Sequence, residues 1–201
     1  MSINNGNNDL IEYLQSLSGE IDPKQGSIAI ILAAGHGKRI KSERSKMLHE
    51  IWGVPTVVRV ANAASKGLAS NNQIIVVGIK ACEVAESAGK RANRIFVYQT
   101  EQKGTGHAVK EALSAISQNG HIKDIYIFPG DMGLITPAVV SELKRRFEQS
   151  GCGLALLTGN YKGEPEANSY GRIIRVPART ATGEPSGEDE GRVIEIKEHK
   201  D

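Results

Sequence analysis

Residues 29–48, AIILAAGHGKRIKSERSKML, join an apolar run to a stretch of small and basic side chains. The small residues that follow the run are Ala33, Ala34, Gly35 and Gly37, and two of the basic ones are Arg39 and Lys46. Small side chains leave backbone N–H groups accessible, and such groups favour phosphate oxygens where a loop turns into a helix. Cationic side chains can bridge the same oxygens. These residue types and their spacing predict an anion site.

Two common phosphate-binding loops do not match this segment. A P-loop places Ser or Thr after its Gly-Lys pair, whereas Arg39 follows Lys38 here. A dinucleotide-binding loop places a third glycine where this chain has Ile40. Taken alone, the loop is also compatible with a glycine turn that only links a strand to a helix.

A second segment, QTEQKGTGHA at residues 99–108, closes one apolar run and opens a helical one. The amides of Gln99 and Gln102 offer donors and acceptors that can read the edge of a nucleotide base. Gly104 and Thr105 again present open backbone at the start of a helix. The segment therefore predicts a base-reading loop.

A single carboxylate, Asp131, ends a further apolar run in the segment FPGD at residues 128–131. Mg²⁺ is commonly held by one or two carboxylates together with substrate phosphates, so we expect Asp131 to be a Mg²⁺ ligand. The histidines His36, His49 and His107 lack the spacing of a metal cluster, and we expect surface or structural roles for them.

The elements that position these residues alternate along the chain. Strands are expected at residues 27–33, 72–79, 94–99, 124–130 and 153–161. Helices are expected at residues 55–68, 82–92, 106–117 and 137–150. Apolar strands that alternate with helices predict an α/β fold with a Rossmann-like, doubly wound, mostly parallel sheet. Ligands bind beyond the carboxyl ends of such strands, so the three segments are expected to converge on one crevice.

The remaining parts of the chain flank this pattern. Residues 1–27 are interpreted as an extension with a short amphipathic helix in DLIEYLQSL that packs on the domain formed by residues 28–201. The runs SYGRIIRV and GRVIEIKEH predict a small antiparallel hairpin near the C-terminus. Between them, residues 177–191 are rich in Pro, Gly and acidic side chains and predict a mobile, solvated insertion. Trp52 is expected to pack under the glycine-rich loop.

Composition narrows the class of protein. Lysine and arginine number 25 against 23 acidic residues, a net charge of +2, so we expect neither a nucleic-acid nor a membrane partner. The sequence is compatible with a homo-oligomer but contains no feature that supports one. The two cysteines, Cys82 and Cys152, have no disulfide or zinc spacing, which favours a reducing cytosol. The N-terminus lacks the pattern of a signal peptide, so a cytoplasmic location is expected.

Four motifs, in this order, give the chain a family resemblance. LAAGHGKRI, QTEQKGTGHA, YGRI and EHKD resemble landmarks of the sugar-nucleotide pyrophosphorylases, and most closely those of the uridylyltransferase half of the bifunctional GlmU enzymes. The resemblance runs from about Ile28 to Asp201. It implies an enzyme that makes UDP-N-acetylglucosamine, a cell-wall precursor, and pyrophosphate from UTP and N-acetylglucosamine 1-phosphate, with Mg²⁺ as cofactor.

The resemblance also implies roles for individual residues. The nucleotide would be held by Leu32, Ala33, Ala34, Gly35, Gly37, Gln99, Gln102, Gly104 and Thr105. Arg39 and Lys46 would contact phosphates and support the transfer, and Asp131 would bind Mg²⁺. The sugar side would be formed by Gly130, Gly171 and Glu198.

The sequence departs from the family pattern in three respects. Lys38 stands where the family usually has Thr, and Ser45 where it usually has Pro. The family also has an Asn that touches the sugar nucleotide and a second metal ligand after the EHKD segment, so a domain truncated at its C-terminus is expected. Two alternatives therefore stay open. One is a non-catalytic module that binds a sugar nucleotide, and the other is a nucleotidyltransferase for a different sugar 1-phosphate or base.

Overall fold

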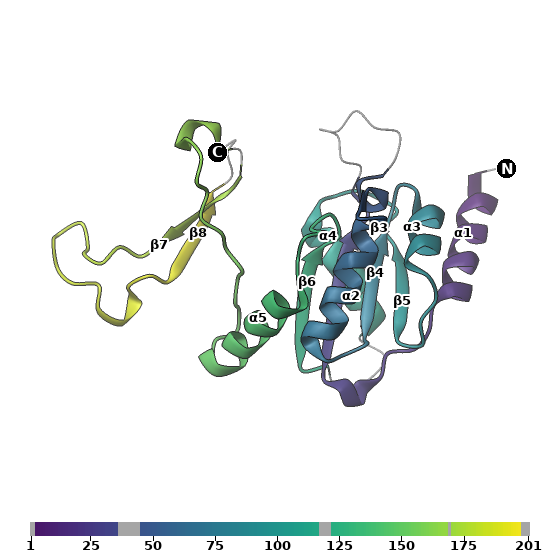
Figure 1. Cartoon of the computed structure of the whole chain (residues 1–201), viewed down its shortest axis with the longest axis horizontal. Coiled ribbons are helices and arrows are strands. Elements are labelled where there is room, and N and C mark those ends of the chain that lie inside the picture. Colours follow the sequence, from purple (N-terminus) through teal and green to yellow (C-terminus); the bar gives the residue numbers. More distant parts are fainter. Residues whose placement is uncertain (1–2, 36–44, 117–121, 169, 198–201) are drawn as a thin grey trace. The chain divides into compact units, whose positions relative to one another are not determined.

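The computed structural model describes residues 3–35, 45–116, 122–168 and 170–197 (Figure 1). Its contacts divide the chain into two compact units, Met1–Cys152 and Gly153–Asp201. Each unit is described by itself below.

A parallel four-stranded sheet forms the centre of the first unit. Its strands, in the order in which they are hydrogen-bonded, are β5 (Arg94–Tyr98), β4 (Gln73–Val77), β1 (Ser27–Ala33) and β6 (Asp124–Pro129). From β1 the chain moves outward to β4 and β5 and then returns to pair β6 with the other side of β1. This reversal is the signature of a doubly wound sheet, as the sequence predicts, and its switch point lies between β1 and β6.

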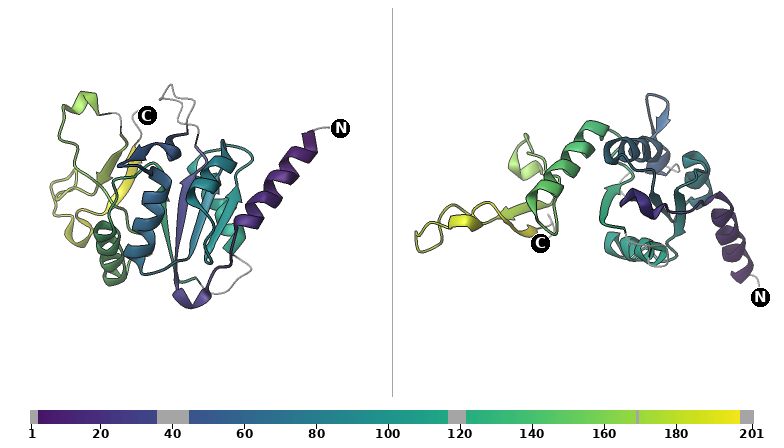
Figure 2. Two further views of the ribbon diagram at one scale, coloured as in Figure 1. Left: turned by 45° about the vertical axis from the view of Figure 1, so that its right-hand side comes forward. Right: turned by 90° about the horizontal axis from the view of Figure 1, so that it is seen from below.

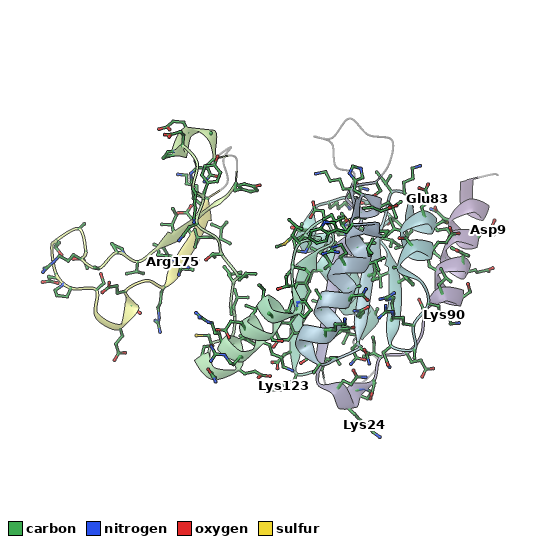
Figure 3. The ribbon with its side chains drawn as sticks, in the orientation of Figure 1. Asp9, Lys24, Glu83, Lys90, Lys123 and Arg175 are labelled. Atoms are coloured by element: carbon green, nitrogen blue, oxygen red, sulfur yellow. The ribbon has the colours of Figure 1, made fainter. Side chains whose placement is uncertain are left out.

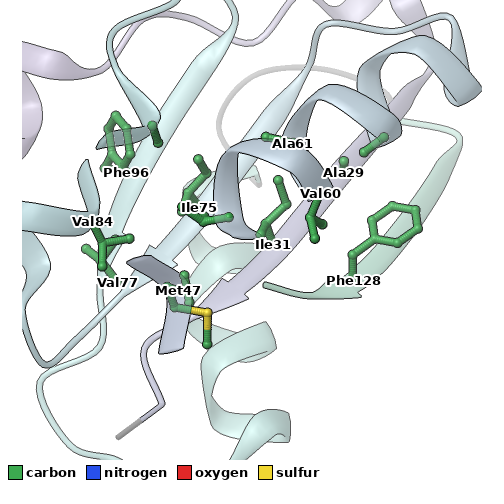
Figure 4. Close-up of a cluster of buried hydrophobic side chains, with 14 of the residues drawn as sticks. Ala29, Ile31, Met47, Val60, Ala61, Ile75, Val77, Val84, Phe96 and Phe128 are labelled. Atoms are coloured by element: carbon green, nitrogen blue, oxygen red, sulfur yellow. The ribbon is translucent and has the colours of Figure 1, made fainter. Parts of the chain in front are cut away.

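Helices cover both faces of this sheet (Figure 2). They are α2 (Thr56–Leu68), α3 (Ala81–Ala88), α4 (Thr105–Ile116) and α5 (Pro137–Ser150). The sheet residues Ile31 and Ile75 pack with Val60 of α2 on one face (Figure 4). On the other face, residues of α4 pack on alternate strand residues such as Ile30 and Ile74. Because β1 and β4 are buried on both faces, their residues after Ser27 and Gln73 are all apolar.

The helix ends follow the sequence signals. Thr136 caps α5 by accepting a hydrogen bond from Val139 N at 3.3 Å, and Pro137 occupies the first turn, where its missing N–H costs nothing. Gly151 ends α5 with φ of 65°, a left-handed conformation that favours glycine. α5 also packs closely on α2, since a Cβ at Gly67 would lie 2.5 Å from Val140 Cβ.

The N-terminal residues cover the outer edge of β5. Helix α1 (Ile3–Leu17) packs Leu14 into the core, and Lys90 donates to the carbonyl of Ser16 near its end (Figure 3). Beyond α1, Ser18 Oγ accepts a hydrogen bond from Phe96 N at 3.0 Å, and Gly19 N donates to the Arg94 carbonyl at 2.7 Å. An unpaired strand edge invites pairing with other chains, so this contact protects β5.

A short 3-10 turn and a two-stranded hairpin follow the glycine-rich loop. They comprise η2 (Lys46–Leu48), β2 (Glu50–Ile51) and β3 (Val54–Pro55). The expectation that Trp52 packs under the loop is wrong, because its side chain is 81% exposed at the hairpin tip. The tight turn gives Trp52 a φ of 52° and points its ring outward, with the Arg59 guanidinium 4.8 Å from the ring centroid.

The second unit is built on the predicted C-terminal hairpin. Strands β7 (Arg172–Arg175) and β8 (Val193–Lys197) pair antiparallel, with short 3-10 turns η3 (Pro165–Ala167) and η4 (Gly187–Asp189) beside them. The strand predicted at residues 153–161 is wrong. Among the described residues of this unit only β7 and β8 form a sheet, so the run finds no strand partner and Leu154 is 76% exposed.

The predicted insertion at residues 177–191 is held by backbone hydrogen bonds. Thr180 N donates to the Glu184 carbonyl at 2.9 Å, and Ser186 N donates to the Ala178 carbonyl at 3.0 Å. Its mobility, and the division into residues 1–27 and 28–201, stay predictions. None of the helices in the described ranges combines the length and apolarity needed to cross a membrane.

Candidate functional site

The site centres on the switch point, where β1 and β6 end side by side. Gly130 N donates to the Leu32 carbonyl at 2.9 Å and so continues the pairing of these strands beyond their last residues. A Cβ at Gly130 would lie 2.9 Å from Met47 Sδ and 3.0 Å from the Leu32 carbonyl oxygen. The absence of a side chain at Gly130 therefore lets η2 approach the strand ends and places Asp131 beside them.

The loop after β5 reaches the same edge of the sheet. Gln102 Nε2 donates to the carbonyl of Ala34 at 2.9 Å, next to Gly35. Gly78, at the end of β4, also meets this loop, since a Cβ there would lie 2.8 Å from the Ala34 carbonyl oxygen. The ends of β1, β4, β5 and β6 thus meet along one edge, as the sequence predicts.

Open backbone borders this edge in two places. A Cβ at Gly35 or at Gly104 would meet nothing within 4 Å, and Gly104 has φ of 98°, which strongly favours glycine. Gly104 directly precedes α4, and its carbonyl accepts the hydrogen bond from Ala108 N. The first N–H groups of α4, beginning at Thr105, have no partner within the helix and favour an anion.

Lys46 is anchored through its backbone. Ser45 caps η2 by accepting from Met47 N, the side chain of Met47 is buried, and Thr56 Oγ1 donates to the Lys46 carbonyl at 3.0 Å. The half-buried Lys46 side chain makes no hydrogen bond or ion pair with any described residue. Its ammonium group is therefore available to a ligand.

Asp131 is exposed, and its carboxylate has no hydrogen-bond or ion-pair partner in the described ranges. Within those ranges no group of three or more His, Cys, Asp or Glu side chains could hold a metal ion. A single carboxylate still fits Mg²⁺, which keeps several waters and is commonly completed by substrate phosphates. Asp131 therefore has the right chemistry for a metal bound together with a nucleotide.

One ion pair on this rim is internal. Lys103 pairs with Glu101, and the hydrogen bond between them lowers the pKa of Glu101 and raises that of Lys103. Both side chains are mostly exposed, so the pair contributes little to stability. Lys46, by contrast, has no ion-pair partner among the residues that the structure describes.

The structure brings most of the predicted residues to one edge. This set consists of Leu32, Ala33, Ala34, Gly35, Lys46, Gln99, Gln102, Gly104, Thr105, Gly130 and Asp131. Gly37, Arg39 and Glu198 lie outside the described residues. Gly171 lies in the second unit, directly before β7, and it is not assigned a place in this site.

Sequence reasoning missed one polar group at this edge. His107, for which only a surface or structural role is expected, lies on the first turn of α4 with Nδ1 3.0 Å from Gln99 Nε2. Its position two residues after Thr105, on the helix that follows the predicted base-reading loop, is the signal that could have pointed to it.

The fold and these groups define a class: α/β proteins whose ligand crevice lies at the switch point of an open parallel sheet. Comparison with known families gives the particular one. The model of the MobA-like NTP transferase domain matches residues 29–194, so the chain belongs to this family of nucleotidyltransferases.

Curated relatives agree with this membership. The chain is 37% identical over 177 residues to the bifunctional protein GlmU of Shouchella clausii, a match that covers 88% of this chain and 34% of the relative. It is 36% identical over 179 residues to the GlmU protein of Desulfotalea psychrophila, covering 89% and 47%. The chain thus spans between a third and a half of the length of these relatives.

Solved structures agree on the fold. A UDP-glucose pyrophosphorylase complexed with UDP-glucose has a TM-score of 0.51 and 17% identity, with coverage of 73% of this chain and 62% of that one. At this level of identity the likeness concerns the fold alone.

Proposed function

We propose that this chain is a uridylyltransferase that forms UDP-N-acetylglucosamine and pyrophosphate from UTP and N-acetylglucosamine 1-phosphate. The observation that carries the proposal is the meeting of three features at one sheet edge. These are the open backbone at Gly35 and Gly104, and the Lys46 ammonium and Asp131 carboxylate, which have no partner among the residues that the structure describes. The relatives named GlmU support the choice of sugar nucleotide.

The reaction needs alignment of two anions rather than a protein nucleophile. An oxygen of the sugar phosphate attacks the α-phosphorus of UTP, the bond to the bridging oxygen of the β-phosphate breaks, and pyrophosphate leaves with that oxygen. Holding both reactants in line lowers the entropic part of the barrier. Positive charge near the oxygens that become more negative in the transition state lowers the electrostatic part of the barrier.

The chain's own residues supply these functions in the proposal. The N–H groups near Gly35 and at the start of α4 bind phosphate oxygens, and Lys46 neutralises charge on them. Gln99 and Gln102 contact the base and ribose. Asp131 would hold Mg²⁺, which when bound supplies further charge neutralisation at the phosphates.

Residues outside the described ranges complete the proposed site. Arg39 and Gly37 belong to the glycine-rich segment that follows Gly35, and their proposed roles are phosphate contact and nucleotide binding. On the sugar side we place Gly130 of the first unit, while Gly171 and Glu198 stay predictions of the family resemblance. The two cysteines, both exposed and unpaired, support a reducing cytosolic setting.

Pyrophosphate release tests the proposal. The purified 201-residue chain is incubated with Mg²⁺, N-acetylglucosamine 1-phosphate and one nucleoside triphosphate at a time. Release with UTP and little release with ATP, GTP or CTP is expected. Release with a different triphosphate or with another sugar 1-phosphate alone would replace the substrate assignment. Calorimetric binding of UDP-N-acetylglucosamine without turnover would make the chain a binding module.

A further inference from the structure

Gln99, the residue that follows β5, is a buried amide with a defined orientation. Its side chain is 4% exposed, and Nε2 lies 3.3 Å from the carbonyl oxygen of Gly104. A carbonyl oxygen can only accept a hydrogen bond, so the nitrogen end of the amide must face Gly104. The opposite orientation would set two acceptors against each other.

This orientation determines which ring nitrogen of His107 accepts a hydrogen bond. The same Nε2 lies 3.0 Å from His107 Nδ1, so that ring nitrogen must accept the second amide hydrogen. The ring hydrogen of the neutral imidazole then resides on Nε2, which lies 3.3 Å from Glu111 Oε1. A relay of hydrogen bonds from Gly104 through Gln99 to His107 thus selects one tautomer.

The relay uses both donors of Gln99 and leaves its acceptor unused. Gln99 Oε1 makes no hydrogen bond with any described residue, and although most of the side chain is buried, this oxygen itself is accessible. Gln99 therefore presents an acceptor alone to a ligand. His107 determines this, since it is the partner that holds the second N–H.

We propose that His107 is a positioning residue that acts through Gln99 and sets the choice of pyrimidine base. The inference rests on the proposed function, in which Gln99 contacts the base. Uracil carries a hydrogen at N3, whereas cytosine has a lone pair there. An amide that can only accept favours the uracil edge and repels the cytosine N3 lone pair.

Without His107 the amide loses this constraint. The remaining contact to Gly104 is the longer of the two and is shared, because the same carbonyl accepts from Ala108 N at 3.2 Å. The amide can then turn and offer a donor to cytosine N3. The expected consequence is weaker discrimination between UTP and CTP, not a general loss of fold or rate.

Three variants of the full chain test this inference. His107→Leu removes the acceptor, His107→Gln replaces it with a side-chain carbonyl oxygen, and Lys110→Ala changes an exposed residue of the same helix as a control. The ratio of kcat/KM for UTP to that for CTP is measured for each. His107→Leu is expected to lower the ratio about tenfold, the effect of one hydrogen bond. His107→Gln and Lys110→Ala are expected to keep it.

A purely structural histidine would give a different result. It would lower kcat/KM for both nucleotides equally and leave the ratio unchanged in His107→Leu, and this outcome overturns the inference. Equal ratios in His107→Gln and His107→Leu, both below that of the parent, overturn it as well, since the acceptor would then not matter.

A second readout separates this inference from the proposed function. In the chain labelled with ¹⁵N-histidine, NMR reports which ring nitrogen of His107 carries the hydrogen, with or without nucleotide. Hydrogen on Nε2 is expected, and hydrogen on Nδ1 overturns the relay. A parent chain that neither turns over nor binds UTP and CTP overturns the proposed function and the base selection together. UTP turnover with an unchanged ratio in His107→Leu overturns only the role of His107.

Discussion

Two buried glutamines at opposite ends of the sheet differ in what their amides bond to. Gln73 begins β4 and is 0% exposed, and Gln99 follows β5 and is 4% exposed. Gln73 Nε2 donates to the Ala61 carbonyl at 2.6 Å and to Ser65 Oγ at 2.9 Å, while its Oε1 accepts two hydrogen bonds from Arg94. Gln99 Oε1, by contrast, accepts no hydrogen bond from any residue in the described ranges.

The difference distinguishes polar groups that stabilise the fold from polar groups that can bind a ligand. At the amino ends of the strands, the polar groups of Gln73 and Arg94 satisfy one another inside the protein. At the carboxyl ends, Gln99, Lys46 and Asp131 retain bonding capacity toward the described surroundings. Polar groups that stabilise a fold are normally satisfied within it, so the unused capacity at this edge is consistent with the proposed ligand site.

The largest effect is expected at the carboxyl edge. In the proposed site Lys46 contacts phosphates, so replacing it by Ala should lower kcat about 100- to 1,000-fold, as loss of one transition-state donor does. Stability should change little, because the ammonium has no partner among the described residues. Steady-state pyrophosphate release and thermal unfolding measure the two effects. Lys66→Ala, at an exposed lysine of α2, is the control, and a Lys46→Ala protein as active as the parent would contradict the proposed role.

The next largest effect is expected at the amino ends of the strands, where a substitution should lower stability rather than activity. Arg94 is 1% exposed, and its guanidinium also donates to the carbonyls of Ala88 and Gly89. Burial, together with the nearby charge of Arg91, lowers the pKa of Arg94 to about 10. Arg94→Met would leave several buried acceptors unsatisfied and should destabilise the fold by about 3 kcal/mol.

Urea unfolding measures the stability of Arg94→Met, with Arg91→Met at the exposed neighbouring arginine as its control. Activity per folded molecule should stay near that of the parent. The double variant of Gln73→Leu and Arg94→Met should lose less stability than the sum of the single variants, because Gln73→Leu removes the Oε1 acceptor that Arg94→Met leaves unsatisfied. Additive losses would show that the two side chains act independently.

Much of this comparison follows from the sequence. The alternation of apolar runs and helical segments predicts the parallel sheet, and the parallel sheet predicts that Gly35, Gln102 and Asp131 meet at one edge. The strand 27–33 and the helix 137–150 are found with the predicted bounds. These predictions succeed because periodicity and end signals depend on neighbouring residues.

Other features depend on contacts that the sequence pattern does not encode. The run at residues 153–161 has strand composition, but a strand also needs a hydrogen-bonded neighbour, and the described second unit gives it none. Trp52 is a large apolar residue of the kind that usually packs in a core, but it lies in the two-residue turn, where its side chain points outward. The roles of Gln73 and Gln99 differ through partners such as Arg94 and His107, which no local pattern distinguishes.

A smaller effect is expected at a buried hydroxyl group that, unlike most buried polar groups, has no hydrogen-bond partner among the described residues. Tyr126 of β6 is 5% exposed, and its hydroxyl has no partner in the part of the chain that the structure describes. Burial, with the charge of Asp124 nearby, raises the pKa of this hydroxyl to about 12. Tyr126→Phe should therefore stabilise the first unit by about 1 kcal/mol, since an unsatisfied polar group is removed.

The contrast with Tyr13 provides the control for this prediction. The Tyr13 hydroxyl donates to Glu86 at 2.8 Å on the surface, so Tyr13→Phe should be neutral or slightly destabilising. Urea denaturation of both variants gives the sign of each change. A loss of stability in Tyr126→Phe would mean that the hydroxyl is satisfied, for example by a buried water.

The smallest effect is expected where polar groups are partnered but exposed. Hydrogen bonds from Arg145 and Arg146 lower the pKa of Glu142 on α5 to about 2. Because the folded-state pKa lies below the unfolded one, the stabilisation is present above about pH 4.5 and is lost as the pH falls toward 2. Glu142→Gln should thus lower the unfolding temperature slightly at pH 7 and not at pH 2, and salt should shrink the difference. An equal difference at both pH values would show that Glu142 acts through packing rather than charge.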